Sequence, residues 1–216
     1  ALNAVVAIYI YSLLPEFLMR FLVWILVSTL YRIRASGLEN IPREGPALLV
    51  CNHVSYVDAL IIGACVRRPV RFVMWYKIFQ VPLLRFVFAT AKAIPIASAR
   101  ENSELLEESF ERIDQELADG NLVCLFPEGA ITRDGHVHSF RPGLERILDN
   151  RPVPVVPLAL GGLWGSWFSR RRGQLRTLPL RFLAAVSLRV GKAVPARDAT
   201  AARLELLVRT LRGGDR

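Results

Sequence analysis

Residues 47–58 read ALLVCNHVSYVD, and this stretch decides how the rest of the chain is interpreted. Its first part, Ala47 to Cys51, is an uninterrupted apolar run with the length of a buried strand. Polar residues follow at once, with His53 and Asp58 close behind the run. Because open α/β sheets place their sites at the carboxyl ends of strands, this junction predicts a sheet with a functional site at its edge.

Strand-like and helix-like segments alternate along the rest of the chain. Apolar runs predict further strands at 71–75, 93–96, 122–126, 153–160 and 182–190. Helical patterns occupy 55–66, 82–91, 102–118, 144–148 and 200–211. The pattern is clearest in 102–118, where Asn102 is placed to cap the start and Gly120 the end. We expect an α/β fold whose mixed, largely parallel sheet is covered by helices on both faces.

The first 34 residues form two apolar runs separated by Pro15, Glu16 and Arg20. Neither run reaches the roughly 18–20 residues of a clean transmembrane helix. We expect an apolar helical hairpin broken near Pro15 that lies at a membrane surface. An alternative interpretation makes residues 1–14 the end of a longer spanning helix, because the chain begins with alanine. We therefore divide the chain into a membrane-associated helical segment, residues 1–34, and an α/β domain, residues 35–216.

His53 and Asp58 are the first candidates for chemistry. Five helical steps turn by about 500°, so the two residues do not share one helix face. They meet if His53 lies in the loop and Asp58 in the first turn of the following helix. Asp58 then accepts a hydrogen bond from one ring nitrogen and leaves the other nitrogen free as a base. The alternative is a purely structural hydrogen bond between the two side chains.

A second polar loop, residues 126–135 (FPEGAITRDG), follows another buried strand. It offers the carboxylate of Glu128, the flexible Gly129, the hydroxyl of Thr132 and the guanidinium of Arg133. Arginine suits bidentate phosphate binding. A base on one loop and an anion-binding group on the other predict a site for a phosphorylated alcohol. The alternative for Glu128 and Arg133 is a salt bridge within the loop.

Four sequence motifs now carry a resemblance to a known family. Asn52-His53 with Asp58, and Phe126-Pro127-Glu128-Gly129, resemble the first and third motifs of the glycerophosphate and lysophospholipid acyltransferases. The string VPVVP at 153–157 resembles their fourth motif, and KAIPI at 92–96 with Arg100 is similar to the second. The fuller strings resemble a bacterial branch in which this domain is fused to a transporter-like membrane domain.

The resemblance implies an acyltransferase that works on lysophospholipids. His53 would act as general base on the acceptor hydroxyl and Asp58 would orient it. The hydroxyl would attack an acyl thioester of CoA or acyl carrier protein, with no acyl-enzyme and no cofactor. The chain contains no GxSxG elbow, and we expect Ser55 to cap the following helix. The alternative acceptor is 1-acylglycerol-3-phosphate, which would give phosphatidic acid.

The resemblance also implies substrate-binding residues. Glu128 and Gly129 would hold the glycerol part and Arg133 the phosphate. The commonest form of the third motif places Thr-Arg directly after Glu-Gly, whereas two residues intervene before Thr132 here, so Thr132 and Arg133 are displaced. Arg100 and Lys77 are further candidates for phosphate contacts.

The charge distribution indicates an anionic partner. The net charge is +9, and residues 150–197 hold nine basic residues and no acidic one. Trp164, Trp167 and Phe168 precede Arg170–Arg172 in this basic stretch, a combination suited to the headgroup boundary of a bilayer or to an acidic carrier protein. The alternative is a basic surface that aids solubility. With three single cysteines indicating a reducing compartment, we expect the cytoplasmic face of the bacterial inner membrane.

Other function classes have less support. His136 and His138 lack a third ligand nearby in the sequence, so we predict no metal site. No Walker loop or GxGxxG motif indicates a nucleotide, and no recognition motif indicates nucleic acid. A non-catalytic lipid-binding module is the alternative from a different class.

Overall fold

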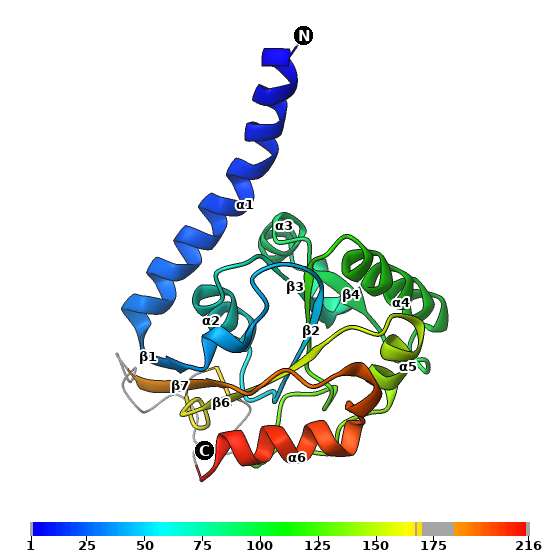
Figure 1. Cartoon of the computed structure of the whole chain (residues 1–216). Helices are drawn as coiled ribbons and strands as arrows, with labels where there is room; N and C mark the ends of the chain where they lie inside the picture. The colour runs from blue at the N-terminus through cyan, green and yellow to red at the C-terminus, as the bar shows by residue number, and fades with distance from the viewer. Residues whose placement is uncertain (1, 167, 170–183, 215–216) are drawn as a thin grey trace.

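Within the residues that the computed structural model describes, seven strands form one sheet in the order β1-β7-β6-β2-β5-β3-β4 (Figure 1). The structure describes residues 2–166, 168–169 and 184–214, without the side chains of 2–15 and 82–84. The strands are β1 (Tyr31–Ser36), β2 (Ala47–Cys51), β3 (Val70–Trp75), β4 (Ile94–Ile96), β5 (Leu122–Leu125), β6 (Val155–Gly161) and β7 (Ala184–Val190).

Five neighbouring strands of this sheet run in the same direction. β6, β2, β5, β3 and β4 pair in parallel, whereas β7 pairs antiparallel with β6 and β1 pairs parallel with β7. The predicted mixed, largely parallel sheet is therefore confirmed. The carboxyl ends of β2 and β5 lie side by side, since Val50 is in register with Leu125.

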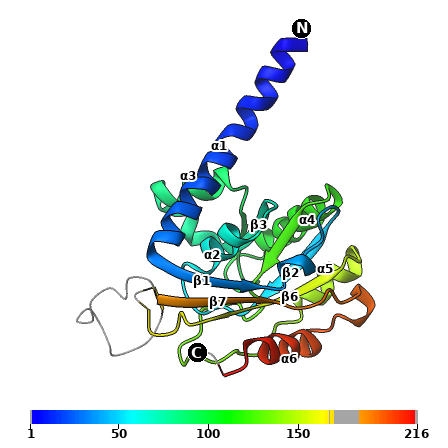
Figure 2. The ribbon, with the colours of Figure 1, turned by 60° about the vertical axis from the view of Figure 1, so that its left-hand side comes forward.

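Helices cover both faces of the sheet, as the sequence predicts. They are α1 (Leu2–Leu30), α2 (Asp58–Cys65), α3 (Pro82–Thr90), α4 (Ser103–Ala118), α5 (Gly143–Asn150) and α6 (Ala201–Arg212). Alternate residues of β2 face opposite layers: Leu49 packs in the core beneath α1 and α2, and Leu48 packs with α4, α5 and α6. Figure 2 shows α2 and α3 on one side of the sheet and α6 on the other.

Helix α4 begins and ends as its sequence predicts. The side chain of Asn102 accepts a hydrogen bond from the Leu105 backbone N–H at 2.9 Å. Gly120 follows the helix with a φ of +81°, a conformation that favours glycine. The amphipathic face buries Ile113 and Leu117 against the sheet.

The predicted helical hairpin at the N-terminus is wrong. α1 is one continuous helix from Leu2 to Leu30, and Figure 1 shows its N-terminal half projecting beyond the sheet. Proline removes one backbone hydrogen bond from a helix interior, but it does not break this long apolar helix at Pro15. Glu16 and Arg20, which we read as an interruption, instead attach α1 to the domain. Arg20 donates to the backbone oxygens of Val66 and Arg67, both at 2.8 Å.

Residues 31–34, which we assigned to the helical segment, lie instead in strand β1. Their alternation fits an edge strand, because Tyr31 is buried while Arg32 and Arg34 are exposed. Among the residues with described side chains, no helix has the length and hydropathy needed to cross a membrane.

Large apolar side chains nevertheless cover one side of α1. Val27 is buried against the domain, whereas the opposite side exposes a row of apolar residues: Phe17, Leu18, Phe21, Leu22, Trp24, Ile25 and Leu26. An exposed apolar patch of this size marks a contact surface.

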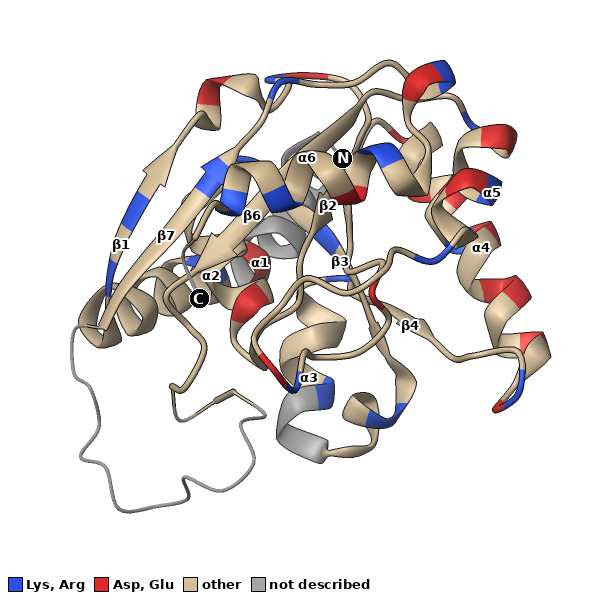
Figure 3. Ribbon diagram, turned by 90° about the horizontal axis from the view of Figure 1, so that it is seen from below, with Lys and Arg blue, Asp and Glu red and all other residues tan. Residues whose placement is uncertain are grey.

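Charge is also unevenly distributed. Figure 3 shows acidic residues along α4 and α5 and basic residues along β1, β7 and α6. Much of the basic stretch predicted to meet anions, including Trp167, Arg170–Arg172, Arg176 and Arg181, lies outside the described residues.

Candidate active site

The candidate site occupies the edge of the sheet where the parallel strands end. β2 leads into the loop with Asn52 and His53, and the neighbouring β5 leads into the loop with Phe126 and Glu128. Two hydrogen bonds join these loops: the His53 N–H donates to Glu128 Oε1 at 2.8 Å, and the Thr132 N–H donates to the His53 carbonyl at 2.9 Å. The first and third sequence motifs are thus neighbours in space.

His53 and Asp58 form the expected pair. The His53 Nδ1 atom lies 2.8 Å from Asp58 Oδ2. His53 comes from the loop and Asp58 from the first turn of α2, which is the arrangement that their spacing in the sequence requires. The Asp58 side chain is fully buried, whereas 22% of the His53 side chain is exposed. One ring edge therefore faces the protein while part of the ring is open to a substrate.

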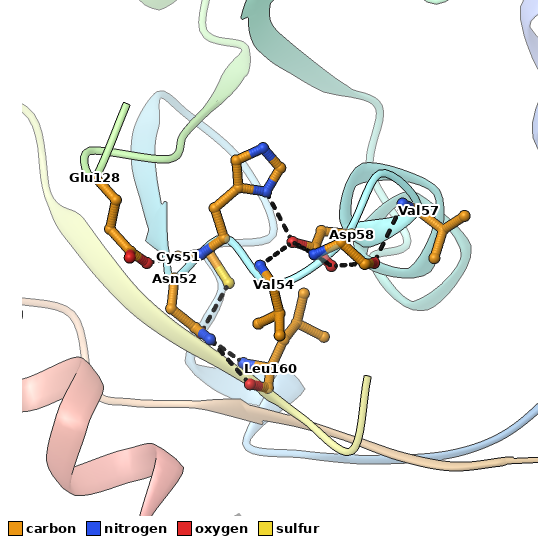
Figure 4. Close-up of polar contacts among 9 residues, drawn as sticks. Cys51, Asn52, Val54, Val57, Asp58, Glu128 and Leu160 are labelled. Carbon is orange, nitrogen blue, oxygen red and sulfur yellow. Dashed lines mark hydrogen bonds and ion pairs between the residues drawn. The ribbon is translucent and has the colours of Figure 1, made fainter. Parts of the chain in front are cut away.

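Three further donors hold the Asp58 carboxylate in place. The Val54 N–H donates to Oδ2 at 2.6 Å, and the Ser55 N–H donates to the same oxygen at 3.0 Å. The Ser55 hydroxyl donates to Oδ1 at 2.7 Å, so Ser55 orients the carboxylate and does not cap α2 as we expected. Figure 4 shows Asp58 beside the backbone of Val54, and Glu128 on the opposite side of the loop that begins with Asn52.

These contacts assign roles to the two imidazole nitrogens. A carboxylate surrounded by donors is an acceptor, so Nδ1 carries the proton and donates to Asp58. The Nε2 atom is then the basic nitrogen. The Phe126 ring stacks on the imidazole with a centroid distance of 4.3 Å and an interplanar angle of 22°. Our sequence reasoning missed Phe126, although it directly precedes Pro-Glu-Gly in the third motif.

Asn52 supports the loop from the other side. Its amide donates to the Leu160 carbonyl at 3.0 Å and accepts from the Leu160 N–H at 2.8 Å. These two bonds continue the pairing between β2 and β6 beyond the last strand residue. They hold the backbone next to His53 on the sheet, a role that the sequence alone did not indicate.

Glu128 connects three segments of the site. One carboxylate oxygen accepts from the His53 N–H, and the other accepts from the His138 N–H at 2.9 Å. Burial raises the pKa of Glu128, although these two backbone hydrogen bonds oppose the shift. Within the described residues Glu128 forms no ion pair with Arg133, so the alternative of a salt bridge within the loop is wrong. Both oxygens instead hold the site's backbone.

The remaining candidate residues of the loop 126–135 differ in their exposure to solvent. Gly129 has a φ of +69° and donates its N–H to the Phe126 carbonyl at 3.0 Å. Thr132 is only 2% exposed, and its hydroxyl donates to Asp134 at 2.9 Å. Arg133 is exposed to solvent. The hydroxyl of Thr132 is thus engaged inside the loop, whereas Arg133 is open to an anion.

Lys77 and Arg100 follow β3 and β4 on the same edge of the sheet. Lys77 lies 3.9 Å from Glu101 and stands 4.9 Å above the Trp75 ring, and Arg100 is exposed. β3 and β4 are two and three strands from β2, which at about 4.8 Å per strand places them roughly 10 and 14 Å away. The structure therefore brings His53, Asp58, Glu128 and Thr132 together, whereas the roles of Lys77 and Arg100, which follow more distant strands, stay predictions.

Comparison with known proteins identifies the family. Residues 32–161, more than half of the chain, match the family model described as Acyltransferase. The chain belongs to the acyltransferase family. The matched range of this acyltransferase begins in β1, ends with β6 and contains both loops of the site.

Curated relatives of the acyltransferase share one name. A chloroplast 1-acyl-sn-glycerol-3-phosphate acyltransferase of Arabidopsis thaliana is 29% identical over 133 residues, which cover 61% of this chain and 36% of the relative. A 1-acyl-sn-glycerol-3-phosphate acyltransferase of Pseudomonas aeruginosa is 30% identical over 144 residues, covering 65% and 54%. The chain spans about a third to a half of the length of the first relatives that it matches.

A solved structure shares the fold. The crystal structure of the 1-acyl-sn-glycerophosphate acyltransferase PlsC from Thermotoga maritima superimposes with a TM-score of 0.67. The match covers 83% of this chain and 70% of that one, at 21% sequence identity. The α/β architecture of this acyltransferase is therefore that of a known family fold.

Proposed function

We propose that this chain transfers a fatty acyl group from an acyl thioester to the free hydroxyl of a lysophospholipid, with 1-acylglycerol-3-phosphate as the preferred acceptor. The observation that carries the proposal is the His53–Asp58 pair, which leaves Nε2 as the basic nitrogen beside the Glu128 loop. Family membership supports the reaction type. The names of the curated relatives support the acceptor.

In the proposed reaction His53 acts as general base. Its Nε2 atom takes the proton of the acceptor hydroxyl as the hydroxyl oxygen attacks the thioester carbonyl carbon. The imidazolium that forms is stabilised by the buried Asp58 carboxylate, 2.8 Å from Nδ1. The new carbon–oxygen bond forms as the carbon–sulfur bond breaks, and the proton passes from Nε2 to the departing thiolate.

No acyl-enzyme is part of the proposal. The hydroxyl of Ser55 is fully buried and donates to Asp58, so it is not poised as a nucleophile. Cys51 and Cys124 are also fully buried, and burial raises the pKa of both thiols. A raised thiol pKa suppresses the thiolate that a nucleophile requires. Direct transfer between the two substrates fits these surroundings.

The proposed location is the cytoplasmic face of the bacterial inner membrane. Apolar residues of α1 are exposed, among them Phe17 at 71% and Trp24 at 51%. Tyr56 and Phe168, joined by a backbone hydrogen bond of 3.1 Å beside the site, are exposed as well. A membrane surface would cover both regions and deliver the lipid acceptor. If replacing Phe17 and Trp24 by Ser abolishes partition of the protein onto anionic vesicles, membrane attachment through α1 is supported. Unchanged partition contradicts that attachment.

The acyl donor in this proposal is acyl-CoA or acyl carrier protein. The basic residues along β1, β7 and α6 fit either donor, because both carry negative charge. The transporter-like membrane domain expected from the resemblance stays a prediction.

Acceptor-dependent thiol release tests the proposed function. The protein in detergent micelles is incubated with palmitoyl-CoA or palmitoyl carrier protein and one acceptor at a time: 1-acylglycerol-3-phosphate, other lysophospholipids, or monoacylglycerol. We expect fastest thiol release with 1-acylglycerol-3-phosphate. Lipid binding without thiol release from either donor would identify a non-catalytic lipid-binding module.

A further inference from the structure

A cationic side chain outside the predicted set packs on the third motif. The guanidinium of Arg141 lies against Gly129: a Cβ atom at that glycine would meet the Arg141 Cζ, Nε and Nη1 atoms at 2.5, 2.6 and 2.9 Å. A Cβ atom at this position would push the guanidinium away from the turn. Gly129 therefore does two things, because its φ of +69° closes the turn and its missing side chain makes room for the guanidinium.

Two hydrogen bonds fix the backbone at Phe140 and Arg141. The Arg141 N–H donates to the Pro127 carbonyl at 2.9 Å. The preceding Phe140 is buried, and its N–H donates to Glu205 of α6 at 3.1 Å. The backbone from which the Arg141 side chain extends is thus held at a defined place beside the loop.

Arg141 differs from its neighbours in having no acidic partner. Arg146 pairs with Glu107, and Arg151 pairs with Asp114 at 2.7 Å. In the described part of the chain, the exposed Arg141 guanidinium has neither a carboxylate partner nor a hydrogen-bond acceptor. An uncommitted guanidinium beside a candidate site is suited to bind an anion from solution.

The position of Arg141 relative to His53 fits a small phosphorylated alcohol. Phe126 and Gly129 are the ends of a hydrogen-bonded turn, whose first and last Cα atoms are less than about 7 Å apart. The Phe126 ring stacks on His53, and Arg141 packs on Gly129. The base and the cation therefore flank one turn. The central hydroxyl and the phosphate of glycerol 3-phosphate are also close together, because only a few covalent bonds separate them.

We propose that Arg141 binds the phosphate of the acceptor lipid. This inference rests on the proposed function and extends it to a residue outside the four family motifs. Two inserted residues displace Thr132 and Arg133 from the place that Thr-Arg takes in the commonest motif. Thr132 is buried with its hydroxyl engaged, so it offers nothing to a phosphate. Arg133 is exposed on the same loop, but it lies four residues beyond Gly129, whereas the Arg141 guanidinium packs directly on Gly129.

Steady-state kinetics of Arg141→Leu test the assignment, with Arg43→Leu as the matched control. Arg43 is also exposed, but it precedes β2 and lies at the opposite edge of the sheet. We expect Arg141→Leu to raise KM for 1-acylglycerol-3-phosphate by about 10- to 100-fold with kcat nearly unchanged, because a charge-assisted contact made before the reaction is lost. Arg43→Leu leaves KM unchanged.

Varying each substrate separates two sources of phosphate. CoA also carries phosphate groups, so KM for palmitoyl-CoA is measured at saturating acceptor. The proposal predicts no change in that KM and no change in KM for monoacylglycerol, which lacks a phosphate. A rise for palmitoyl-CoA alone would assign Arg141 to the donor, and equal rises for all acceptors would make it a structural residue; either result overturns the proposal.

Gly129→Ala provides an independent variant that keeps the positive charge. The new Cβ displaces the Arg141 guanidinium and also strains the turn at its φ of +69°, so KM for the phosphorylated acceptor rises while the net charge stays the same. Equilibrium binding of fluorescent 1-acylglycerol-3-phosphate is measured in parallel. If the wild type releases no thiol yet Arg141→Leu weakens this binding tenfold or more, the proposed function fails while the phosphate site stands. Unchanged binding in Arg141→Leu would overturn the site itself.

Discussion

Replacing Asp58 by Asn isolates the charge that is proposed to stabilise the imidazolium. Asp58 Oδ2 accepts from three nitrogens, namely those of the His53 ring, Val54 and Ser55, whereas Oδ1 faces the Ser55 hydroxyl and the Ser55 N–H. An asparagine therefore keeps its oxygen at the Oδ2 position and places its amide nitrogen at Oδ1. The Ser55 hydroxyl can rotate to accept from that amide. The tautomer and the geometry of His53 are then retained, and the negative charge is lost together with the Oδ1 acceptor of the Ser55 N–H.

The size of the effect follows from the distance between the charges. Opposite unit charges about 4 Å apart attract by about 4 kcal/mol at an effective dielectric constant of 20. Since about 1.4 kcal/mol in the barrier changes a rate tenfold, Asp58→Asn should lower kcat about 10³-fold. KM should stay near the wild-type value, because the charge acts only once the proton has moved. One mismatched polar contact should lower the free energy of unfolding by about 1 kcal/mol.

Thiol release at saturating substrates measures kcat, and chemical denaturation measures the free energy of unfolding. Asp149→Asn is the control, because Asp149 is exposed on α5 and the same change in charge is made away from the site. A fully folded Asp58→Asn variant with kcat within tenfold of the wild type would refute the role of this carboxylate in stabilising an imidazolium.

Three further predictions concern the supports of the site. Glu128→Gln removes one acceptor for the backbone N–H groups of His53 and His138, so the free energy of unfolding should fall by about 1–3 kcal/mol. Denaturant titration measures this change, and an unchanged free energy of unfolding would contradict the bridging role of Glu128. Arg71→Met leaves Glu16 of α1 without its 2.8 Å partner, so the free energy of unfolding should fall by about 3 kcal/mol. Glu16→Gln in the same background should recover part of that loss, because it removes the unpaired charge. Hydrogen bonds from the His136 N–H and the Thr132 hydroxyl lower the pKa of Asp134 to about 2. The contribution of ionised Asp134 to the free energy of unfolding should therefore be present above the ordinary pKa of 3.8 and be lost as the pH falls towards 2. An NMR titration midpoint near 3.8 for Asp134 would contradict this prediction.

Much of the sheet could be predicted because its strands are buried on both faces. β2 and β5 are continuous apolar runs followed at once by polar residues, which locates both the strands and the loops that hold the site. The spacing of His53 and Asp58 allowed one arrangement, loop and first helical turn, and the structure has that arrangement.

The errors came from residues whose partners are distant in sequence. Glu16 and Arg20 looked like an interruption of α1, but they pair with Arg71 and with the end of α2. Arg32 and Arg34 made β1 look unlike a strand, because its pairing with β7 is formed by residues about 150 positions away. Arg141 was overlooked because its contact depends on the fold of the Gly129 turn.

The most direct test of the proposed reaction compares His53→Ala with His136→Ala. His136 is an exposed histidine near the same loop, so the pair of variants removes the same ring from two positions. We predict that His53→Ala lowers acceptor-dependent thiol release by at least about 10³-fold while its folding and vesicle binding match the wild type, and that His136→Ala stays active. A folded His53→Ala protein that kept about a tenth or more of the wild-type rate would contradict the general-base role of His53.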